Sequence, residues 1–250
     1  MTPSSAESRI DVSSESERFD RYARTYGDAV NASIAITGDS VDEFARIKAE
    51  LVARALSGAE DLRILDFGCG TGLSTRALSA ALPRHRELVG VDPSVESIAV
   101  ARQHGDEIRY EAMDGRALPF GDGSFDVVFT ACVFHHIDRQ EHAHWLAELR
   151  RVLVPNGSLF LFEHNPLNPL TRRAVRACPF DDGVVLLSSA YARRIARDAG
   201  FSVSRATYYY FFPRVLAPLR ATEQALSWCP LGAQYFIRAR NGKGASRLDG

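Results

Sequence analysis

The chain has 250 residues, of which 46% are hydrophobic and 24% are charged. This is enough to build one stable core without disulfide bonds or structural metals. The formal net charge of -1 gives no basic surface field, so the composition disfavours nucleic-acid binding. The only lysines, Lys48 and Lys243, lie away from any motif. Their positions argue against Schiff-base and Walker-type lysine chemistry.

The cysteines and the termini indicate a reduced cytoplasmic protein. The four cysteines are scattered and form no Cys-x-x-Cys pair. The segment 1–17 is rich in serine and glutamate and carries no signal peptide, and no run is long and apolar enough to span a bilayer. We expect a disordered tail at 1–17, a single domain at 18–240, and a loose tail at 241–250.

Two helices are predicted to form an N-terminal cap over residues 18–58. In the first, Tyr22 and Tyr26 lie at helical spacing. In the second, Ser40 and Glu43 have the spacing of a capping box. The apolar face of this second helix consists of Val41, Phe44, Ile47, Leu51 and Ala55.

From residue 63 the pattern changes to strands that alternate with helices. Short apolar runs predict strands at 63–67, 87–92, 107–113, 125–131 and 158–163. Between them, helices are predicted over 74–82, from Ser94 to about Gln103, and after Asp138, which is expected to cap its helix. This alternation predicts a doubly wound α/β sheet, and the fourth run is apolar enough for its centre.

The last part of the chain departs from this alternation. A helix is predicted to begin at Ser188 or Ser189 and to end at Gly200. The segments 201–212 and 233–240 are predicted strands that close the sheet, with an antiparallel hairpin as one pairing. Between them, 211–232 is an apolar helical insertion. It has three interpretations: core or dimer packing, a lid over an apolar substrate, or a membrane-surface helix. The last is disfavoured by its small basic content.

The first predicted strand ends in a glycine loop, ILDFGCGTG, that contains a carboxylate. Gly68 and Gly70 fit the start of a dinucleotide fingerprint, but Leu73 occupies the position of its third small residue. Asp66 would repel a buried pyrophosphate. The loop therefore favours a ligand whose ammonium group faces Asp66 and whose carboxylate faces the following helix N-terminus.

Two further acids end the next two predicted strands. Asp92 follows the loop by the interval at which an acid accepts the hydroxyls of a ribose. Asp114, in MDG after the third strand, can accept a hydrogen bond from an adenine amino group. Together the three acids predict a ligand with an amino-acid end and an adenosine end.

These motifs, in this order, resemble the class I S-adenosylmethionine-dependent methyltransferases. The resemblance rests on LDFGCGTG, GVDPS, MDGRALPFGDGSFDVVFTACVFHHI and LVPNGSLFLFE, and it covers a cofactor-binding core at 60–165. It implies a Rossmann-like sheet of seven strands, the last one antiparallel, and S-adenosylmethionine as the cofactor. The cofactor-binding residues that it implies are Tyr22, Asp66, Gly68, Cys69, Gly70, Asp92, Pro93, Asp114, Gly115 and Ala131.

Three histidines are candidates for the chemistry of methyl transfer. Because the sulfonium donor is already activated, an enzyme of this kind mainly aligns the in-line displacement and excludes water. A hydroxyl acceptor also benefits from a base. His135 and His136 follow the fourth strand, and His164 follows the fifth. Asn165 is either a substrate contact or a residue that satisfies its own loop.

No metal site is expected. His135, His136, Asp138, His142 and His144 are close in sequence, but His142 and His144 lie two residues apart on a predicted helix. Residues at this spacing face different directions and do not readily share one ion. We expect both to be solvated surface residues.

The leading hypothesis is methyl transfer to a small molecule, with a hydroxyl oxygen as the acceptor because of the histidines. Nitrogen or carbon acceptors remain open on the same fold. A protein that binds the cofactor without catalysis is a further alternative, and a nicotinamide oxidoreductase is opposed by Leu73 and Asp66. A nucleic-acid methyltransferase is disfavoured by the balanced charge. The expected partners are a small-molecule acceptor and, as one possibility, a second copy of the chain.

Overall fold

The computed structural model describes residues 20, 23, 25–105, 107–181 and 183–242. Its strands are β1 (Arg63–Phe67), β2 (Glu87–Asp92), β3 (Arg109–Ala112), β4 (Phe125–Ala131), β5 (Leu153–His164), β6 (Ser202–Val203), β7 (Thr207–Tyr209) and β8 (Gln234–Arg240). Its α-helices are α2 (Tyr26–Ile34), α3 (Val41–Ala55), α4 (Leu73–Ala81), α5 (Val95–Arg102), α6 (His142–Val152), α7 (Pro169–Ala177) and α8 (Ser189–Asp198). Short 3₁₀ helices are η1 (Ala35–Thr37), η2 (Phe134–His136), η3 (Pro179–Asp181) and η4 (Arg214–Leu226).

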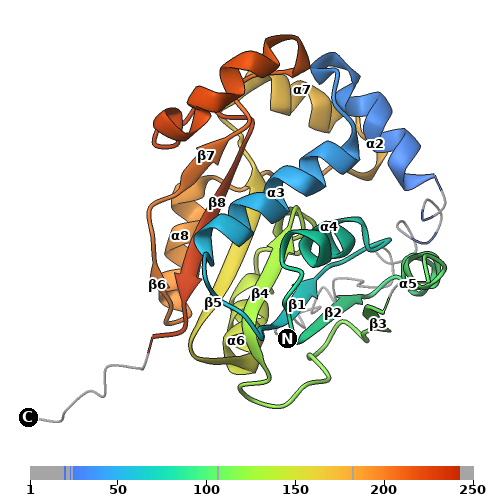
Figure 1. Ribbon diagram of the computed structural model, residues 1–250, viewed down its shortest axis with the longest axis vertical. Helices are drawn as coiled ribbons and strands as arrows, with labels where there is room; N and C mark the ends of the chain where they lie inside the picture. Colours follow the sequence, from blue (N-terminus) through green and yellow to red (C-terminus); the bar gives the residue numbers. More distant parts are fainter. Residues whose placement is uncertain (1–19, 21–22, 24, 106, 182, 243–250) are drawn as a thin grey trace, which may run out of the picture.

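The strands form one sheet in the order β3-β2-β1-β4-β5-β8-β6, with β7 also paired to β8 (Figure 1). Strands β1 to β5 pair in parallel, and β8 runs antiparallel to β5. The predicted doubly wound sheet with an antiparallel last strand is therefore confirmed. The segment 201–212 pairs with β8 in two pieces, β6 and β7, so the sixth strand of the expected seven is interrupted.

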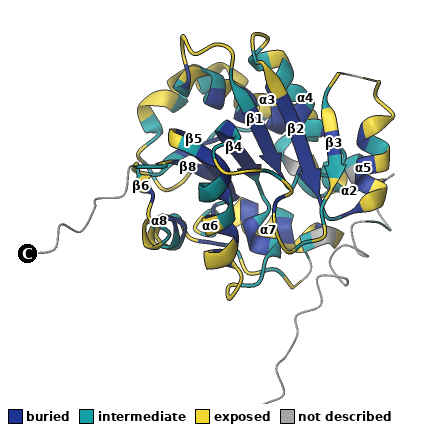
Figure 2. Cartoon of the chain, turned by 90° about the horizontal axis from the view of Figure 1, so that it is seen from below, coloured by how far each residue is buried: buried dark blue, intermediate teal, exposed yellow. Residues whose placement is uncertain are grey.

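Helices cover both faces of the sheet, and each face has its own core (Figure 2). Alternate side chains of β1 illustrate the division, because successive residues of a strand point to opposite faces. Leu65 and Phe67 pack with Trp145 and Leu146 of α6. Ile64 packs with the cluster of α3 and α4. Asp66 follows the same alternation, which places its carboxyl on the α3 and α4 side of the sheet.

Helix starts were predicted well where a serine supplies the cap. The side chains of Ser40, Ser94 and Ser188 accept hydrogen bonds from the backbone three residues later, at the starts of α3, α5 and α8. The prediction that Asp138 caps a helix is wrong. Its carboxylate accepts from the amide of Gln140 in a turn, and α6 begins only at His142.

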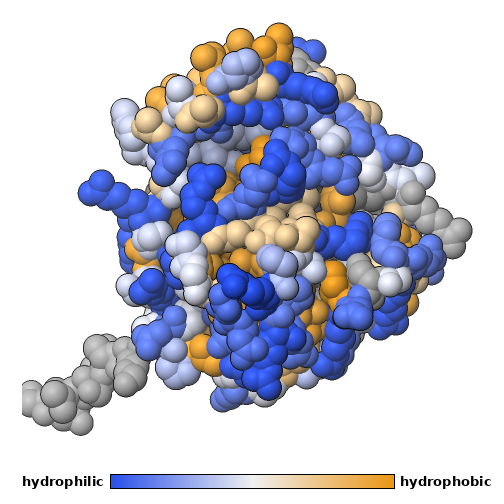
Figure 3. Space-filling model, in the orientation of Figure 1, coloured by the Kyte–Doolittle hydropathy of each residue, from blue (hydrophilic) through white to orange (hydrophobic). Residues whose placement is uncertain are grey.

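The insertion at 211–232 lies beside the N-terminal helices, at the top of the view in Figure 1. Arg220 and the hydroxyl of Tyr210 both contact Asp39, and the rings of Tyr210 and Phe44 have centroids 4.2 Å apart. No residue of η4 is buried, and Val215 and Trp228 are 83% and 75% exposed. Apolar side chains are visible at the same end of the molecule in Figure 3. Core packing is therefore wrong for η4, whereas the dimer-face, lid and membrane-surface interpretations stay predictions.

Glu223 provides a test of how the insertion is held to the sheet. Its carboxylate accepts hydrogen bonds from the backbone amides of Tyr210, Phe211 and Phe212. Because an amide side chain offers a single acceptor oxygen and no charge, we expect Glu223→Gln to lower the free energy of unfolding by about 1–3 kcal/mol in a denaturant titration. Glu60→Gln is the matched control. It alters only an exposed pair with Arg84 and should change the stability by less than about 0.5 kcal/mol.

The predicted tail at 1–17 lies outside the described residues, as does most of the predicted tail at 241–250. Asn241 does not behave as part of a loose tail, because its side chain bonds with Arg150, Leu153 and Val154. The cysteines form no disulfide bond in the structure. Among the described helices, none combines the length and the hydropathy needed to cross a bilayer.

Candidate functional site

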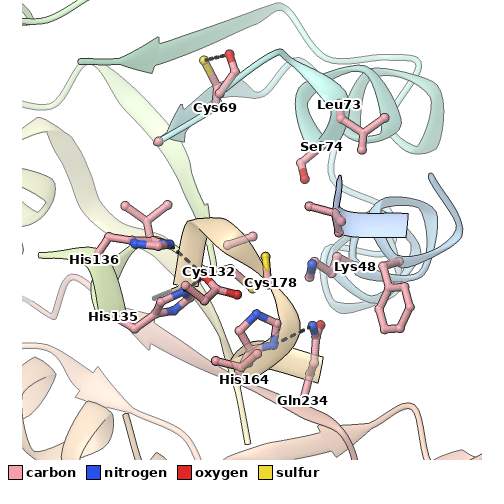
Figure 4. Close-up of a pocket in the computed structure, with 18 of the residues that line it drawn as sticks. Lys48, Cys69, Leu73, Ser74, Cys132, His135, His136, His164, Cys178 and Gln234 are labelled. Atoms are coloured by element: carbon pink, nitrogen blue, oxygen red, sulfur yellow. Dashed lines mark hydrogen bonds and ion pairs between the residues drawn. The ribbon is translucent and has the colours of Figure 1, made fainter. Parts of the chain in front are cut away.

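A cavity of about 1310 Å³ lies at the carboxyl ends of the parallel strands. Its floor is formed by the loops after β1, β2, β3, β4 and β5, and its other walls come from α2, α3, α6, α7 and the start of the insertion. In Figure 4, His135, His136, Cys132 and His164 border one side, and Ser74 and Leu73 lie across the space from them. Ligands of open α/β sheets bind at this edge. A cavity of this size can hold more than one drug-sized molecule.

The three glycines of the loop after β1 differ in how much space surrounds them. Gly68 has φ +78°, and a β-carbon there would overlap the side chain of Val133. Gly72 has φ +77°, and a β-carbon there would lie 2.7 Å from the hydroxyl of Tyr110. Gly70 has φ +52° and no neighbour within 4 Å, so its backbone faces open space. Gly68 and Gly72 are therefore required for packing, and Gly70 leaves room for a ligand.

This difference predicts different effects of two alanine substitutions. We expect Gly68→Ala to lower the melting temperature strongly, because it combines overlap with backbone strain. Gly70→Ala adds only strain of about 1–2 kcal/mol, but its methyl group enters the ligand space. It should lower the affinity for S-adenosylhomocysteine by about tenfold or more, measured by calorimetry. Equal affinities for the native protein and Gly70→Ala would show that no ligand approaches this backbone.

Asp66 does not lie where the sequence predicted. It is 1% exposed and does not line the cavity; it accepts a 2.7 Å hydrogen bond from Thr75 of α4. Burial raises the pKa of Asp66 to about 7, against the effects of Thr75 and Lys48. In this structure its carboxyl lies beneath the loop rather than on the cavity surface. That Asp66 faces the methionine end of the cofactor stays a prediction.

Asp92 lies at the end of β2 and lines the cavity. One carboxylate oxygen accepts from the amide of Gly70 at 2.8 Å, and the other accepts from the amide of Ser94 at 2.9 Å. Each oxygen keeps a second lone pair for a ligand hydroxyl. Burial raises the pKa of Asp92 to about 6, although both amides oppose this. The other expected cofactor residues that line the cavity are Gly68, Cys69, Gly70, Pro93, Asp114, Gly115 and Ala131.

His135 lies between two carboxylates. Its Nδ1 is 2.6 Å from Glu163, and its Nε2 is 3.4 Å from Asp181. The Nε2 of His136 is 3.3 Å from the same oxygen of Asp181. Burial alone would lower the pKa of His135, but Glu163 and Asp181 raise it well above the ordinary value. Glu163 and Asp181 have lowered pKa values, since the histidines outweigh the effect of burial.

His164 belongs to a second polar group on the same wall. The hydroxyl of Tyr209 donates to Gln234, whose amide nitrogen lies 3.2 Å from the Nδ1 of His164. Burial would raise the pKa of the Cys132 thiol, but His164 lowers it to about 7. Cys132 also has φ +59°, a conformation that a non-glycine residue adopts only when its surroundings impose it. His164 therefore lies on the cavity wall beside an acidic thiol.

Several other predictions are corrected by these positions. His142 is 1% exposed and bonds to the carbonyls of Phe134 and Ile137, so it is a structural residue rather than a solvated one. His144 is exposed, as expected. Asn165 accepts a hydrogen bond from the amide of Leu167 in its own loop and donates to the carbonyls of Pro230 and Gly232, so it is not a cavity residue. Lys48 is only 8% exposed and lines the cavity, so the premise that it lies away from every motif is wrong. Tyr22 lies outside the described residues.

Sequence reasoning also missed Asp181 and Cys132. Asp181 belongs to η3, in a stretch without any recognisable motif, and only the fold brings it to the histidines. Cys132 immediately follows β4 in the same segment as the histidines. Its position after the fourth predicted strand was a usable signal for cavity lining, because this is the active edge of the sheet.

Comparisons with known proteins agree with this geometry. Residues 64–157 match a methyltransferase domain model. A demethylmenaquinone methyltransferase of Thermus thermophilus is 41% identical over 108 residues, covering 42% of this chain and 48% of that protein. A solved S-adenosylmethionine-dependent methyltransferase from Thermotoga maritima superposes with a TM-score of 0.64, at 19% identity, over 91% of this chain and 99% of that one. Residues 64–157 therefore form a methyltransferase domain, and the chain shares the fold of solved S-adenosylmethionine-dependent methyltransferases.

A third similarity concerns the type of reaction. The ubiquinone/menaquinone biosynthesis C-methyltransferase of Hahella chejuensis is 32% identical over 118 residues, which are 44% of this chain and 47% of that protein. Matches to the first curated methyltransferase relatives cover about half of each relative's length. The methyltransferase family uses S-adenosylmethionine, and the cavity contains the glycine loop and the strand-end acids through which that cofactor was expected to bind.

Proposed function

We propose that this methyltransferase transfers the methyl group of S-adenosylmethionine to a small apolar molecule that carries an acidic hydroxyl, such as a phenol. The observation that carries the proposal is the single cavity, which joins the glycine loop and Asp92 to a wall of histidines. One end has the groups expected to hold the donor, and the other has polar groups suited to a hydroxyl. The volume of about 1310 Å³ leaves space for both molecules.

The cofactor is proposed to lie against the loop after β1. The backbone of Gly70 faces open space, so the methionine part can approach it closely. Asp92 can accept from the ribose hydroxyls through the lone pairs that Gly70 and Ser94 leave unused. Lys48, whose ammonium lies close enough to Asp66 to influence its pKa, adds positive charge near the methionine end. The reacting sulfonium would then face the interior of the cavity.

The acceptor is proposed to occupy the part lined by the N-terminal helices and α7. Apolar side chains predominate there, including those of Ile34, Phe44, Leu170, Val175 and Phe211. Relatives named as demethylmenaquinone methyltransferases support a ring-shaped, lipophilic acceptor. A phenol also reconciles the oxygen predicted here with the carbon acceptor in the name of the Hahella relative. Once a phenol loses its proton, both its oxygen and its adjacent ring carbon are nucleophilic.

The histidine wall, formed by His135, His136 and His164, is proposed to bind this hydroxyl and to stabilise its deprotonated form. His135 and His136 face Asp181 at the cavity surface, and His164 lies beside them. Because methyl transfer is an in-line displacement, the wall must hold the oxygen while the sulfonium approaches from the loop side. The remaining contribution is desolvation, since the side chains of His135 and His136 are only 0% and 12% exposed.

The test is turnover of purified full-length protein with S-adenosylmethionine and a panel of phenols, hydroquinones, amines and carboxylates. Release of S-adenosylhomocysteine should be greatest with the phenols and hydroquinones, and product analysis would assign the methyl group to oxygen or carbon. Turnover restricted to amines or carboxylates would contradict the proposed acceptor. Binding of the cofactor without turnover of any acceptor would support a non-catalytic protein. Oxidation of a reduced nicotinamide would support an oxidoreductase.

The raised pKa of Asp92 predicts how cofactor binding depends on pH. Ribose hydroxyls donate to the carboxylate, so binding requires the deprotonated form, whereas the pKa without ligand is about 6. Affinity for S-adenosylhomocysteine should therefore fall by about tenfold from roughly pH 7.5 to roughly pH 5. Calorimetry at both pH values measures this fall, and Asp92→Asn should largely remove it. A native affinity that is constant over this range would contradict the assignment.

The same carboxyl makes the stability of the unliganded protein fall as the pH rises, whereas the affinity for the cofactor should rise with pH. A folded pKa of about 6 lies above the unfolded value of 3.8. Its contribution to stability is therefore fully present below about pH 3.8 and is lost as the pH rises through about 6. Bound cofactor should reverse this trend, because it stabilises the carboxylate. The increase in melting temperature caused by S-adenosylhomocysteine should be larger at high pH than at low pH.

A further inference from the structure

Two imidazoles and one carboxylate converge on a single point of the cavity wall. The Nε2 atoms of His135 and His136 lie 3.4 Å and 3.3 Å from the same oxygen, Oδ1 of Asp181. One ligand atom from each of the three residues lies within 4.8 Å of the other two. The side chains are nearly buried, with exposures of 0%, 12% and 11%. All three residues line the cavity, so the convergence point is open to it.

The contact between His135 and Asp181 is not an ordinary hydrogen bond. The Nε2 of His135 is buried and has no hydrogen-bond partner among the described residues, although a carboxylate oxygen is only 3.4 Å away. Tetrahedral coordination with bonds of about 2.1 Å places neighbouring ligand atoms about 3.4 Å apart. The distances from the two Nε2 atoms to Oδ1 of Asp181 match this separation between neighbouring ligand atoms. The two distances are therefore those expected of three ligands around one ion.

Glu163 prepares His135 for such a centre. Its Oε2 lies 2.6 Å from the Nδ1 of His135, and both side chains are fully buried. A proton on Nδ1 leaves the lone pair of Nε2 directed toward Asp181. Carboxylates commonly orient metal-binding histidines in this way. The two buried carboxylates also supply the negative charge that a divalent cation would balance.

We propose that His135, His136 and Asp181 bind one divalent transition-metal ion of the zinc type, with a fourth position open to the cavity. Two imidazole nitrogens and one carboxylate oxygen are ligands that zinc prefers, and an open fourth position is typical of catalytic rather than structural sites. Within the proposed function, the open position would take the acceptor oxygen, and the ion would favour its deprotonated form. This role depends on the proposed function, but metal binding itself does not.

The sequence predicted no metal because the third ligand was not visible in it. His142 and His144 are the histidines nearest in sequence to the pair, and both have other roles in the fold. Asp181 comes from η3, beyond α7, and lies in contact with the pair only in the folded chain.

The experiment is zinc binding to the full chain in the absence of both cofactor and acceptor. Protein stripped with a chelator is titrated with Zn²⁺ by calorimetry, and with Co²⁺ while the visible absorption spectrum is recorded. We expect one equivalent of Zn²⁺ and the intense absorption bands of tetrahedral Co²⁺. Asp181→Asn should lower the Zn²⁺ affinity by about a hundredfold or more, and Glu163→Gln by about 10–100-fold.

The controls separate this site from surface binding and from unfolding. His104→Gln removes an exposed histidine outside the cavity and should retain the native affinity. A cooperative melting transition in the absence of metal shows that each variant is folded. Zn²⁺ should then raise the melting temperature of the native protein and of His104→Gln but not that of Asp181→Asn. Absence of stoichiometric binding, or native affinity in Asp181→Asn, would overturn the proposal. Neither result would affect methyl transfer measured without added metal, so the two proposals can fail separately.

Discussion

We expect Asp92→Ala to lower the affinity for S-adenosylhomocysteine by at least about a hundredfold. The carboxylate of Asp92 is the one buried, charged acceptor at the end of β2, and its oxygens already organise the amides of Gly70 and Ser94. A hydrogen bond to a charged group contributes about 1.5–3 kcal/mol. Loss of two such bonds to a ribose corresponds to at least two powers of ten in the dissociation constant. Calorimetry with the purified variant measures this change.

Two further variants show whether the lower affinity of Asp92→Ala for S-adenosylhomocysteine arises at the ribose. Asp92→Asn keeps the size of the side chain and one acceptor oxygen, so it should bind with an affinity between those of the native protein and Asp92→Ala. Asp122→Ala changes an exposed carboxylate that pairs with Arg151, outside this cavity, and should bind like the native protein. If Asp92→Ala has native affinity and a native melting temperature, the proposed cofactor pose is wrong.

The sheet could be predicted because its determinants are local. Apolar runs that end in turns predict strands, and serine caps predict helix starts, so Ser40, Ser94 and Ser188 were placed correctly. The carboxyl ends of parallel strands meet at one edge, which is why Asp92 and the histidines after β4 and β5 line one cavity. The sequence did not show that the alternation of β1 turns the carboxyl of Asp66 toward α4, beneath the glycine loop.

The remaining parts of the site depend on contacts between distant segments. Lys48 was set aside because no motif lies near it in sequence, yet α3 brings it to the cavity. His142 was assigned to solvent because it lies two residues from His144 on a helix and cannot share an ion with it, but it is enclosed by the loop that begins at Phe134. Asp181 carries no sequence signal at all. Helical spacing describes one element, and it does not show which loop lies against that element.

The insertion illustrates a different limit of sequence reasoning. Apolar residues at helical spacing usually indicate burial, and this favoured core packing for 211–232. The structure leaves Val215, Trp228 and Leu231 exposed, although Asp39 and Glu223 hold the segment in place. Its first residues, Phe211 and Pro213, line the cavity. The hydrophobic pattern did not show that the first residues of this segment line the cavity while several later apolar side chains are exposed.

The second large expected effect is a loss of turnover when the histidines of the cavity wall are replaced. We expect His135→Asn and His136→Ala each to lower turnover by about 10²–10⁴-fold, the contribution typical of a group that handles the proton of a reacting hydroxyl. Both residues contact Asp181, so each substitution breaks the same cluster. Affinity for S-adenosylhomocysteine should change by less than about threefold, because the proposed cofactor contacts lie at Gly70 and Asp92. Rates of S-adenosylhomocysteine release with the best phenol, together with calorimetry, separate the two effects.

The control for this prediction is His144→Gln, because His144 lines the same cavity but bonds to the carbonyl of Arg116 rather than to Asp181. Its turnover should stay within about twofold of the native rate. If His135→Asn and His136→Ala both retain the native rate, the acceptor oxygen does not meet this cluster. The wall then has a second candidate, because His164 lies beside Cys132 and its ring centroid is 5.3 Å from that of His135. Loss of turnover in His164→Ala alone would move the reacting oxygen to that side of the cavity.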